Sequence, residues 1–289
     1  MSDEADRASA LADAFATLTD ETRVSILEAL AAQQRDGDEP FLRFSDLRRR
    51  VGVRDSGNFN YHLDKLTGTF VRKTDQGYRL TNTGLDVVTA VLAGSYQGYE
   101  EGPVGDVTDC FACGEPMQAE YAAGSLTLSC PAGHGFENAL PPSAVRDRDL
   151  ESAVRLLTIK AETDIELAVS GLCPLCYGEI SWGVTENPDD HVALQFDGGC
   201  TECGADVHGT AGTVIVRHPA VVAFLYDHGI DVRDTPFWTL DLPNDEETYV
   251  ESRDPLRVRV DLTLDDERLS VWVDDDAAVT EVERTPTES

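Results

Sequence analysis

Residues 56–66 have the sequence SGNFNYHLDKL, and residues 44–53, just before them, have the sequence FSDLRRRVGV. Phe59, Leu63 and Leu66 stand at positions i, i+4 and i+7, which places their apolar side chains on one face of a helix. The preceding stretch is also helical in pattern and stops at a glycine, a residue that commonly follows a helix C-terminus. Two short helices joined by a tight turn are therefore predicted here.

The flanking residues extend this pair of helices into a larger pattern. The expected elements, in chain order, are a helix over Arg7–Leu18, a helix after Thr19 or Asp20, a strand over Phe41–Phe44, a helix over Asp46–Val51 capped by Ser45 and ended by Gly52, a helix from Asp55 or Ser56 to Leu66, strands over Phe70–Thr74 and Tyr78–Thr81, and a helix over Thr83–Leu92. Apolar periodicity, capping residues and turn residues indicate these elements. Their order is that of a winged helix-turn-helix.

Residues 11–94 resemble the ArsR-type winged-helix regulators, and more closely those of haloarchaea. The resemblance is carried by LTDETRVSILEAL (18–30), FSDLRRRVGV (44–53), SGNFNYHLDKL (56–66) and FVRKTDQGYRLTNTG (70–84). It implies a DNA-binding domain in a transcriptional regulator. Metal-sensing members carry Cys or His ligands on the third or the last helix. Here the first cysteine is Cys110 and His62 is the single histidine before His134, so the resemblance does not imply metal sensing at those places.

The outer face of the 56–66 helix carries side chains suited to reading bases. The residues expected to contact DNA from this helix are Ser56, Asn58, Asn60, Tyr61 and Lys65. An Asn side chain can bond an adenine edge through two hydrogen bonds in the major groove. Phosphate contacts are expected from Arg48, Arg49 and Arg50, and phosphate or minor-groove contacts from Arg72, Lys73 and Arg79 on the hairpin. For His62, a base contact remains open, and so does a role in packing beneath the hairpin or in holding a phosphate.

Charge separates the two parts of the chain. The net charge is −31, with 20 Arg against 3 Lys, and the acidic residues are spread along the sequence. This spread favours a protein adapted to very high salt over a polyanion mimic or a cation binder. Residues 1–95 have a net charge of −3 and residues 96–289 of −28, yet residues 40–80 have a net charge of +5. A basic patch kept in so acidic a chain indicates a polyanionic partner.

The expected compartment is the cytoplasm. The first ten residues, MSDEADRASA, are polar and acidic, unlike a signal peptide. No stretch approaches the roughly 20 apolar residues that span a bilayer, so no membrane partner is expected. In a reducing cytosol, paired CxxC motifs indicate metal ligands rather than disulfides.

Eight residues in the second half form two sets of four metal ligands. The first set is Cys110, Cys113, Cys130 and His134, and the second is Cys173, Cys176, Cys200 and Cys203. Two such paired turns on neighbouring hairpins supply a zinc tetrahedron, and all seven cysteines are used. His191 and His208 are alternative ligands but lie nearer the second set in sequence. Two structural Zn²⁺ ions per chain, in zinc-ribbon-like modules, are expected, with support of folding as their role.

The remaining sequence indicates further elements without a ligand. Asp147–Val169 is expected to be an amphipathic helix, which either dimerises or packs on its own modules. A linker is expected over Gln97–Asp109, a strand over Thr213–Arg217, a short helix over Pro219–His228, a hairpin over residues 256–273 and a disordered tail from Glu281.

The sequence thus predicts an α+β chain. The expected segments are a winged helix-turn-helix (1–97), a first zinc module (98–145), a connecting helix (146–170), a second zinc module (171–215) and a C-terminal α+β segment (216–289). The expected function is sequence-specific transcription regulation on double-stranded DNA by a homodimer, without enzymatic activity. The alternative is a zinc-ribbon adaptor or general transcription component acting mainly through protein contacts. The operator, the regulated genes, the direction of regulation and any small-molecule effector are not fixed by the sequence.

Overall fold

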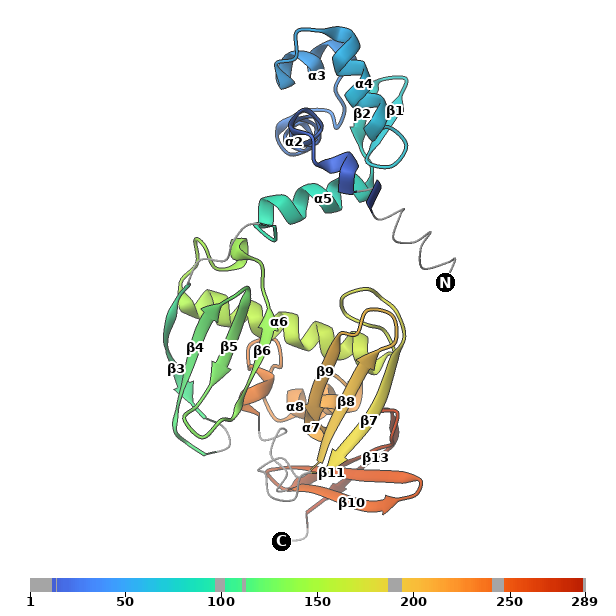
Figure 1. Ribbon diagram of the computed structural model, residues 1–289. Coiled ribbons are helices and arrows are strands. Elements are labelled where there is room, and N and C mark those ends of the chain that lie inside the picture. Colours follow the sequence, from blue (N-terminus) through green and yellow to red (C-terminus); the bar gives the residue numbers. More distant parts are fainter. Residues whose placement is uncertain are drawn as a thin grey trace. The chain divides into compact units, whose positions relative to one another are not determined.

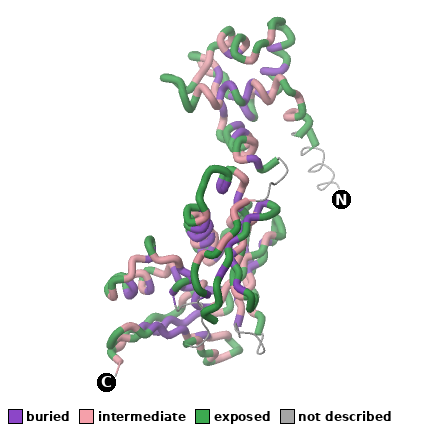
Figure 2. Tube along the Cα trace, turned by 90° about the vertical axis from the view of Figure 1, so that its left-hand side faces the viewer, coloured by how far each residue is buried: buried purple, intermediate pink, exposed green. Residues whose placement is uncertain are grey.

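The computed structural model describes residues 12–13, 15–96, 102–110, 113–186, 194–240 and 247–287. The fold is a mixed α+β arrangement of helices and antiparallel sheets (Figure 1). The chain divides into two compact units, Met1–Gly98 and Tyr99–Ser289, each with its own hydrophobic core. Buried segments run through both units, while many turns and loops are exposed (Figure 2). Among the described residues, no helix is long and apolar enough to cross a membrane.

The first unit is built from helices and one two-stranded hairpin. Its elements are α2 (Glu21–Asp36), α3 (Phe44–Val51), α4 (Ser56–Leu66), β1 (Val71–Thr74), β2 (Gly77–Leu80) and α5 (Asn82–Ala93). The described residues 12–13 and 15–18 are helical as well, while the rest of the expected first helix lies outside the described residues. Asp20 caps α2 and Asp55 caps α4, each accepting a hydrogen bond from a backbone N–H three residues on. The predicted order of helices and hairpin is confirmed over these residues.

The start of α3 differs from the prediction. The helix begins at Phe44 rather than Asp46, and Ser45 is not its cap, because Arg43 stands at the N-cap without a side-chain hydrogen bond. The expected strand over residues 41–44 is reduced to a single bridge, in which Leu42 and Tyr78 exchange two backbone hydrogen bonds. The Phe44 ring packs edge-on against the Phe59 ring at 5.2 Å. This contact draws Phe44 into the helix, since the ring gains more from the core than from a strand edge.

The second unit contains three antiparallel sheets and several helices. Its strands are β3 (Val104–Asp109), β4 (Pro116–Ala122), β5 (Ser125–Ser129) and β6 (Gly135–Ala139) in one sheet, β7 (Ile180–Glu186), β8 (Leu194–Cys200) and β9 (Asp206–Thr210) in a second, and β10 (Thr248–Arg253), β11 (Leu256–Leu264), β12 (Glu267–Val273) and β13 (Val279–Pro286) in a third. Its helices are α6 (Leu150–Val169), α7 (Ala211–Ile215) and α8 (Pro219–Asp227), with short 3-10 turns at η1 (Pro142–Ala144) and η2 (Phe237–Thr239).

Helix α6 packs within its own unit and runs from the β3–β6 sheet to the β7–β9 sheet (Figure 1). Its buried face consists of Ala153, Val154, Leu157, Thr158, Ala161, Ile165 and Ala168. Thr158 accepts a hydrogen bond from the Trp238 indole N–H at 3.1 Å. The same core includes residues of all three sheets and of α7 and α8. The apolar stripe that could have dimerised is therefore used inside the unit, and one core joins segments that the sequence presented as consecutive modules.

Three expectations for the second unit are wrong. Residues 211–215 form helix α7 rather than a strand, because Thr210 caps a helix there by accepting a hydrogen bond from the Thr213 N–H. The expected disordered tail forms β13, which pairs with β12 up to Pro286. This strand is almost fully exposed, so backbone pairing and cross-strand ion pairs such as Arg284 with Glu267 hold it rather than burial.

The end of the expected linker is β3, an edge strand paired with β4. The predicted hairpin over 256–273 is confirmed as β11 and β12.

Candidate metal centres and nucleic-acid interface

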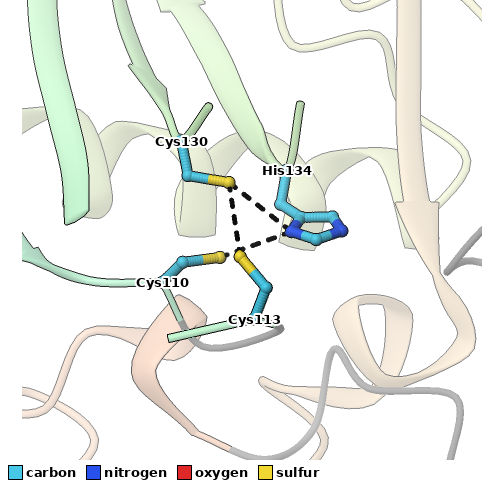
Figure 3. Close-up of side chains that lie close together, drawn as sticks. All are labelled: Cys110, Cys113, Cys130 and His134. Carbon is cyan, nitrogen blue, oxygen red and sulfur yellow. Dashed lines mark hydrogen bonds between the residues drawn. The ribbon is translucent and has the colours of Figure 1, made fainter. Parts of the chain in front are cut away.

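The first metal centre lies at one end of the β3–β6 sheet. Cys110 directly follows β3 and Cys113 precedes β4, while Cys130 follows β5 and His134 precedes β6. The four side chains point toward one another (Figure 3). The ligand atoms, three Sγ and one His ring nitrogen, all lie within 4.8 Å of one another. The pairing of β3 with β4 and of β5 with β6 closes the two ligand turns, and the pairing of β4 with β5 brings these turns together.

Interatomic distances in this centre match a tetrahedron. His134 Nδ1 lies 3.5 Å from Cys110 Sγ and 3.5 Å from Cys130 Sγ, and the Sγ atoms of Cys113 and Cys130 are 3.7 Å apart. Zn–S bonds of about 2.3 Å at tetrahedral angles place sulfur atoms about 3.8 Å apart. A disulfide requires about 2.05 Å. The donor set and its spacing therefore fit one zinc-sized ion and exclude a disulfide in this arrangement.

The second centre has the same plan with four sulfurs. Cys173 and Cys176 lie between α6 and β7, Cys200 ends β8, and Cys203 lies between β8 and β9. The Sγ atoms of Cys173 and Cys203 are 3.7 Å apart, and those of Cys176 and Cys200 are 3.5 Å apart. All four lie within 4.8 Å of one another. The predicted ligand sets are therefore the two groups that the fold brings together.

The turns that carry the ligands are held by backbone hydrogen bonds. The Cys173 N–H donates to the Gly178 carbonyl at 2.8 Å, and the Tyr177 N–H donates to the Cys173 carbonyl at 2.9 Å. Gly114 and Gly204 occupy the equivalent turn position in other knuckles with φ of 74° and 72°. Tyr177 adopts φ of 60° there, a conformation uncommon for a residue with a Cβ. Backbone hydrogen bonds and positive φ angles thus set the shape of the three CxxC turns.

Backbone N–H groups also favour thiolate at the second centre. The Cys203 and Glu202 N–H groups each lie 3.4 Å from Cys200 Sγ. The Cys203 N–H is the main cause of a lowered pKa of the Cys200 thiol, to about 6, against the opposing effect of burial. The Leu175 N–H donates to Cys173 Sγ in the same way. The pKa of the Cys176 thiol is raised to about 12 although the Gly178 N–H lowers it, because the neighbouring thiols of Cys203 and Cys200 raise it. The backbone thus favours the thiolate, the form that binds zinc, at Cys173 and Cys200 rather than at all four cysteines.

Surroundings differ between the two centres. Cys110 and Cys130 belong to the large core of the second unit. Cys173 and Cys200 instead form a small separate cluster with Ile180. The first centre is therefore supported by many apolar contacts, whereas the second has few of its own. A bound ion would contribute more to local folding at the second centre.

Other histidines do not join these ligand sets among the described residues. The His208 ring nitrogens lie 3.0 Å from an oxygen of Asp197 and 2.6 Å from an oxygen of Asp206, on β8 and β9. His191, the other alternative ligand, lies outside the described residues. In the described part of the chain, His134 is the histidine placed with the cysteines.

In the first unit, α4 presents the polar side chains named from the sequence. Its exposed residues include Ser56, Asn58, Asn60, Tyr61 and Lys65, while Phe59, Leu63 and Leu66 are buried. The Asn60 amide donates to Asp64 Oδ2 at 2.7 Å, an i,i+4 contact that the sequence analysis did not consider. The spacing of the two residues is the feature that could have indicated it. Asn58, whose side chain has no described hydrogen bond, is the more available of the two amides.

The three arginines of α3 are not equivalent. Arg48 donates to the Arg54 carbonyl at 2.6 Å, and Arg50 donates to the Gln33 side chain at 3.0 Å. The Arg49 side chain is 78% exposed and lies 3.2 Å from Asp46. Arg49 is thus the most available cation of this turn, while the other two also hold the local structure.

The hairpin places basic side chains on both strands. Arg72 on β1 stands opposite Arg79 on β2, and the Lys73 ammonium lies 5.8 Å from the Tyr78 ring centre. Arg72 and Lys73 are exposed, and Arg79 is half-buried. Like charges placed opposite each other are unfavourable unless an anion lies between or near them. This hairpin is therefore suited to contact an anion.

The structure decides between the two readings of His62. The residue is 9% exposed and its Nδ1 lies 3.1 Å from Asp20 Oδ1. It packs toward the start of α2 rather than outward with Asn58 and Asn60. A base contact by His62 in this conformation is therefore excluded, and its position is structural.

Comparison with known proteins found two family matches and no match among curated proteins. A family described as a domain of unknown function (DUF7347) matches residues 11–91, which include every residue of the candidate nucleic-acid interface. A second family, also described as a domain of unknown function (DUF7351), matches residues 107–279 and includes both metal centres. Because this match covers more than half of the 289 residues, the chain belongs to the DUF7351 family.

Proposed function

We propose that the protein is a sequence-specific DNA-binding transcriptional regulator, in which the first unit is a winged helix-turn-helix of the ArsR type. The observation that carries the proposal is the exposed face of α4, which presents Ser56, Asn58 and Asn60, in a unit whose α3 and hairpin carry further exposed basic side chains. Helix α4 is the recognition helix and enters the major groove. The β1–β2 hairpin is the wing.

Contacts in this proposal divide into two kinds. Asn58 and Asn60 bond base edges, with adenine as the preferred partner of an amide side chain. Arg49, Arg72 and Lys73 neutralise phosphates and set the orientation of the unit on the duplex without reading sequence. Double-stranded DNA of B-form geometry is the ligand, since its major groove is wide enough to admit a helix.

The second unit carries two zinc-ribbon-like modules in this proposal. Cys110, Cys113, Cys130 and His134 hold one Zn²⁺ ion, and Cys173, Cys176, Cys200 and Cys203 hold the other. Each ion supplies a cross-link between two turns. With four protein ligands already present, neither centre keeps the open position that a catalytic zinc uses. The role of zinc here is structural, and no enzymatic activity is proposed.

A homodimer is part of the proposal because one short helix in the major groove contacts few bases and so gives limited sequence specificity. Two recognition helices spaced one turn of DNA apart read a palindromic site with both subunits. The buried face of α6 is occupied within its own unit, so it does not supply the dimer contact in this conformation.

The test is selection of bound duplexes from a randomised DNA pool by the full-length chain. Recovery of one enriched motif is expected, and Asn58→Ala should lose that enrichment. Gln34→Ala, on an exposed part of the same unit outside the proposed interface, is the matched control and should recover the wild-type motif. Failure of the wild-type chain to enrich any motif would remove the proposal of sequence-specific binding.

One observation favours an alternative function through protein contacts. Leu172, Leu175 and Tyr177, beside the second metal centre, are all exposed, and the net charge of residues 96–289 is −28. An apolar knuckle on an acidic surface suits a basic protein segment better than DNA. Under this alternative, an adaptor or general transcription component, Leu175→Ser and Tyr177→Ser would abolish recruitment of the partner while leaving DNA selection unchanged.

A further inference from the structure

Helix α8 is apolar on both of its faces. Its inner side chains, Val221, Phe224 and Leu225, are buried in the core of the second unit. From His218 to Tyr226 the sequence has no Asp, Glu, Lys or Arg, in a chain of which 27% of residues are charged. A helix that is apolar all round is normally covered all round. The outward face of α8 is therefore expected to have an occupant.

That outward face forms one wall of a hollow of about 560 Å³. Pro219, Val222, Ala223 and Tyr226 line it at positions i, i+3, i+4 and i+7, which form a single stripe along the helix. Val232 adds to the apolar lining. The stripe is about 10 Å long at 1.5 Å per residue. The volume of the hollow lies within the range of small-molecule sites, roughly 300–1,000 Å³.

An arginine with available donors stands at one end of the stripe. Arg217 lines the hollow two residues before α8 begins, and its side chain is 32% exposed. Its guanidinium lies 3.7 Å from a Glu162 oxygen and 4.0 Å from a Glu166 oxygen, both beyond hydrogen-bond distance. Among the described residues, no hydrogen bond of this side chain is found. Burial raises the pKa of Glu162, against the opposing effect of Arg217.

The other charged residues that line the hollow, Asp231 and Arg233, are already paired with each other. Arg233 donates two hydrogen bonds to Asp231, at 3.0 and 2.6 Å. The Arg233 side chain is the main cause of a lowered pKa of Asp231, about 2, so this carboxylate stays ionised and paired. Arg217 and Arg233 therefore differ in what they can offer to a ligand, although both line the same hollow.

We propose that this hollow, named here the α8 pocket (Arg217, Pro219, Val222, Ala223, Tyr226, Val232 and the paired Asp231 and Arg233), binds a small organic acid whose carboxylate pairs with Arg217 and whose apolar body lies along α8. A planar guanidinium with unused donors fits a carboxylate through two parallel hydrogen bonds. The apolar stripe covers a body of about its own length, and Tyr226, which is 68% exposed, supplies an aromatic face. The proposal concerns the second unit and does not depend on DNA binding.

The test is calorimetric titration of the full-length, zinc-loaded chain with 3-phenylpropanoate and with octanoate. At least one of the two acids is expected to bind with one site per chain. The corresponding neutral amides should bind at least about tenfold more weakly, because a hydrogen bond to a charged group contributes more than a neutral one. Absence of binding by both acids, or equal affinity for acids and amides, would overturn the proposal.

Three variants locate the site. Arg217→Gln should weaken acid binding roughly tenfold to hundredfold, by loss of the charge-assisted pair. Arg155→Gln is the matched control and should change affinity by less than about threefold, since Arg155 is exposed on α6 and does not line the pocket. Ala223→Trp, at an exposed position, should fill the pocket and abolish binding with an unchanged thermal unfolding midpoint. If Ala223→Trp instead converts a stable oligomer to a monomer in sedimentation analysis, α8 is covered by protein and the ligand proposal is wrong.

Discussion

The Nδ1 atom of His62, in the middle of α4, lies 3.1 Å from Oδ1 of Asp20, the N-cap residue of α2. The same oxygen accepts the Arg23 backbone N–H at 3.1 Å and lies 3.7 Å from Arg23 Nε. The side chains of His62 and Arg23 are largely buried. One carboxylate therefore caps α2 and holds α4 against it, which links the stability of the first unit to the placement of the proposed recognition helix.

Replacement of Asp20 by alanine is expected to destabilise the first unit by about 0.5–2 kcal/mol, because it removes the side-chain cap of α2. Chemical denaturation of the full-length chain, followed by a probe in the first unit, measures this change. Asp20→Asn keeps the capping oxygen and removes the charge, so it should cost clearly less. Equal loss for the two variants would show that the cap contributes little.

Asn58→Ala is expected to weaken specific DNA binding by about 1–3 kcal/mol and to relax the base preference at one position. Asn60→Ala should have a smaller effect, because the Asn60 amide is already held by Asp64. Asp64→Ala should release that amide and remove a negative charge from the DNA-facing surface, and so should tighten binding. Electrophoretic mobility shifts on the selected motif compare the three variants. Tighter binding by Asn58→Ala would contradict the assignment of α4.

Arg49→Ala is expected to weaken binding to all DNA sequences about equally, since a phosphate contact carries no base information. The slope of log affinity against log salt should fall by about one unit. Arg48→Ala differs from it, because Arg48 also bonds the Arg54 carbonyl and its loss should lower the stability of the unit as well. A change of preferred motif in Arg49→Ala would mean that Arg49 reads bases.

Metal removal is expected to affect the two centres differently. Intact protein should contain two zinc ions per chain, and Cys173→Ser or Cys200→Ser should each lose one and unfold β7–β9. Cys113→Ser should also lose one ion but keep β3–β6 folded, because that centre belongs to the large core. Elemental analysis and amide hydrogen exchange measure occupancy and local folding. The isolated 1–98 fragment should stay folded, and fewer than two ions in the intact chain would contradict the ligand assignment.

Trp272→Phe is expected to destabilise the second unit near pH 7 and not at low pH. The Trp272 indole N–H donates to Glu251 at 2.9 Å and is the main cause of the lowered pKa of Glu251, with Arg257 and Arg259 also contributing. A carboxyl group whose pKa is lowered by folding adds stability above its unfolded pKa, about 4.3, and loses it as pH falls through the folded pKa. Unfolding curves of both proteins across pH 3–7 should therefore converge toward the acid end. A constant difference would show that lost packing, not the carboxylate, is responsible.

Salt dependence of DNA binding is expected to be unusual. Phosphate contacts gain free energy by counterion release, so their contribution falls as salt rises. Beyond about 1 M salt the Debye length is under about 3 Å, which screens both the +5 patch and the −28 on residues 96–289. Specific binding should therefore be retained or strengthen between about 0.5 and 2 M KCl. A steep monotonic loss over that range would show that phosphate contacts dominate and that the acidic composition does not reflect life in high salt.

The sequence by itself determined the features that depend on neighbours close in the chain. The apolar stripe of α4, the end of α3 at Gly52 and the caps of α2 and α4, each narrowed to two adjacent residues, all involve residues within one or two helical turns. The ligand pairs were also determined locally, because CxxC spacing, or the spacing of Cys130 and His134, places two donors on one turn, and the use of all seven cysteines suggested how the pairs combine. These features needed no knowledge of distant contacts.

Tertiary structure alone decided which polar side chains are available to a ligand and which already have a partner within the chain. His62 is buried next to Asp20. Arg50 donates a hydrogen bond to Gln33, which lies 17 residues earlier in the sequence. Strand β13 exists although nearly every side chain in it is exposed, because β12 pairs with its backbone. One core joins both sides of α6, so its apolar stripe has a partner within the chain. Each of these outcomes depends on segments far apart in sequence, whose meeting is set by the sum of packing over the whole unit rather than by any local pattern.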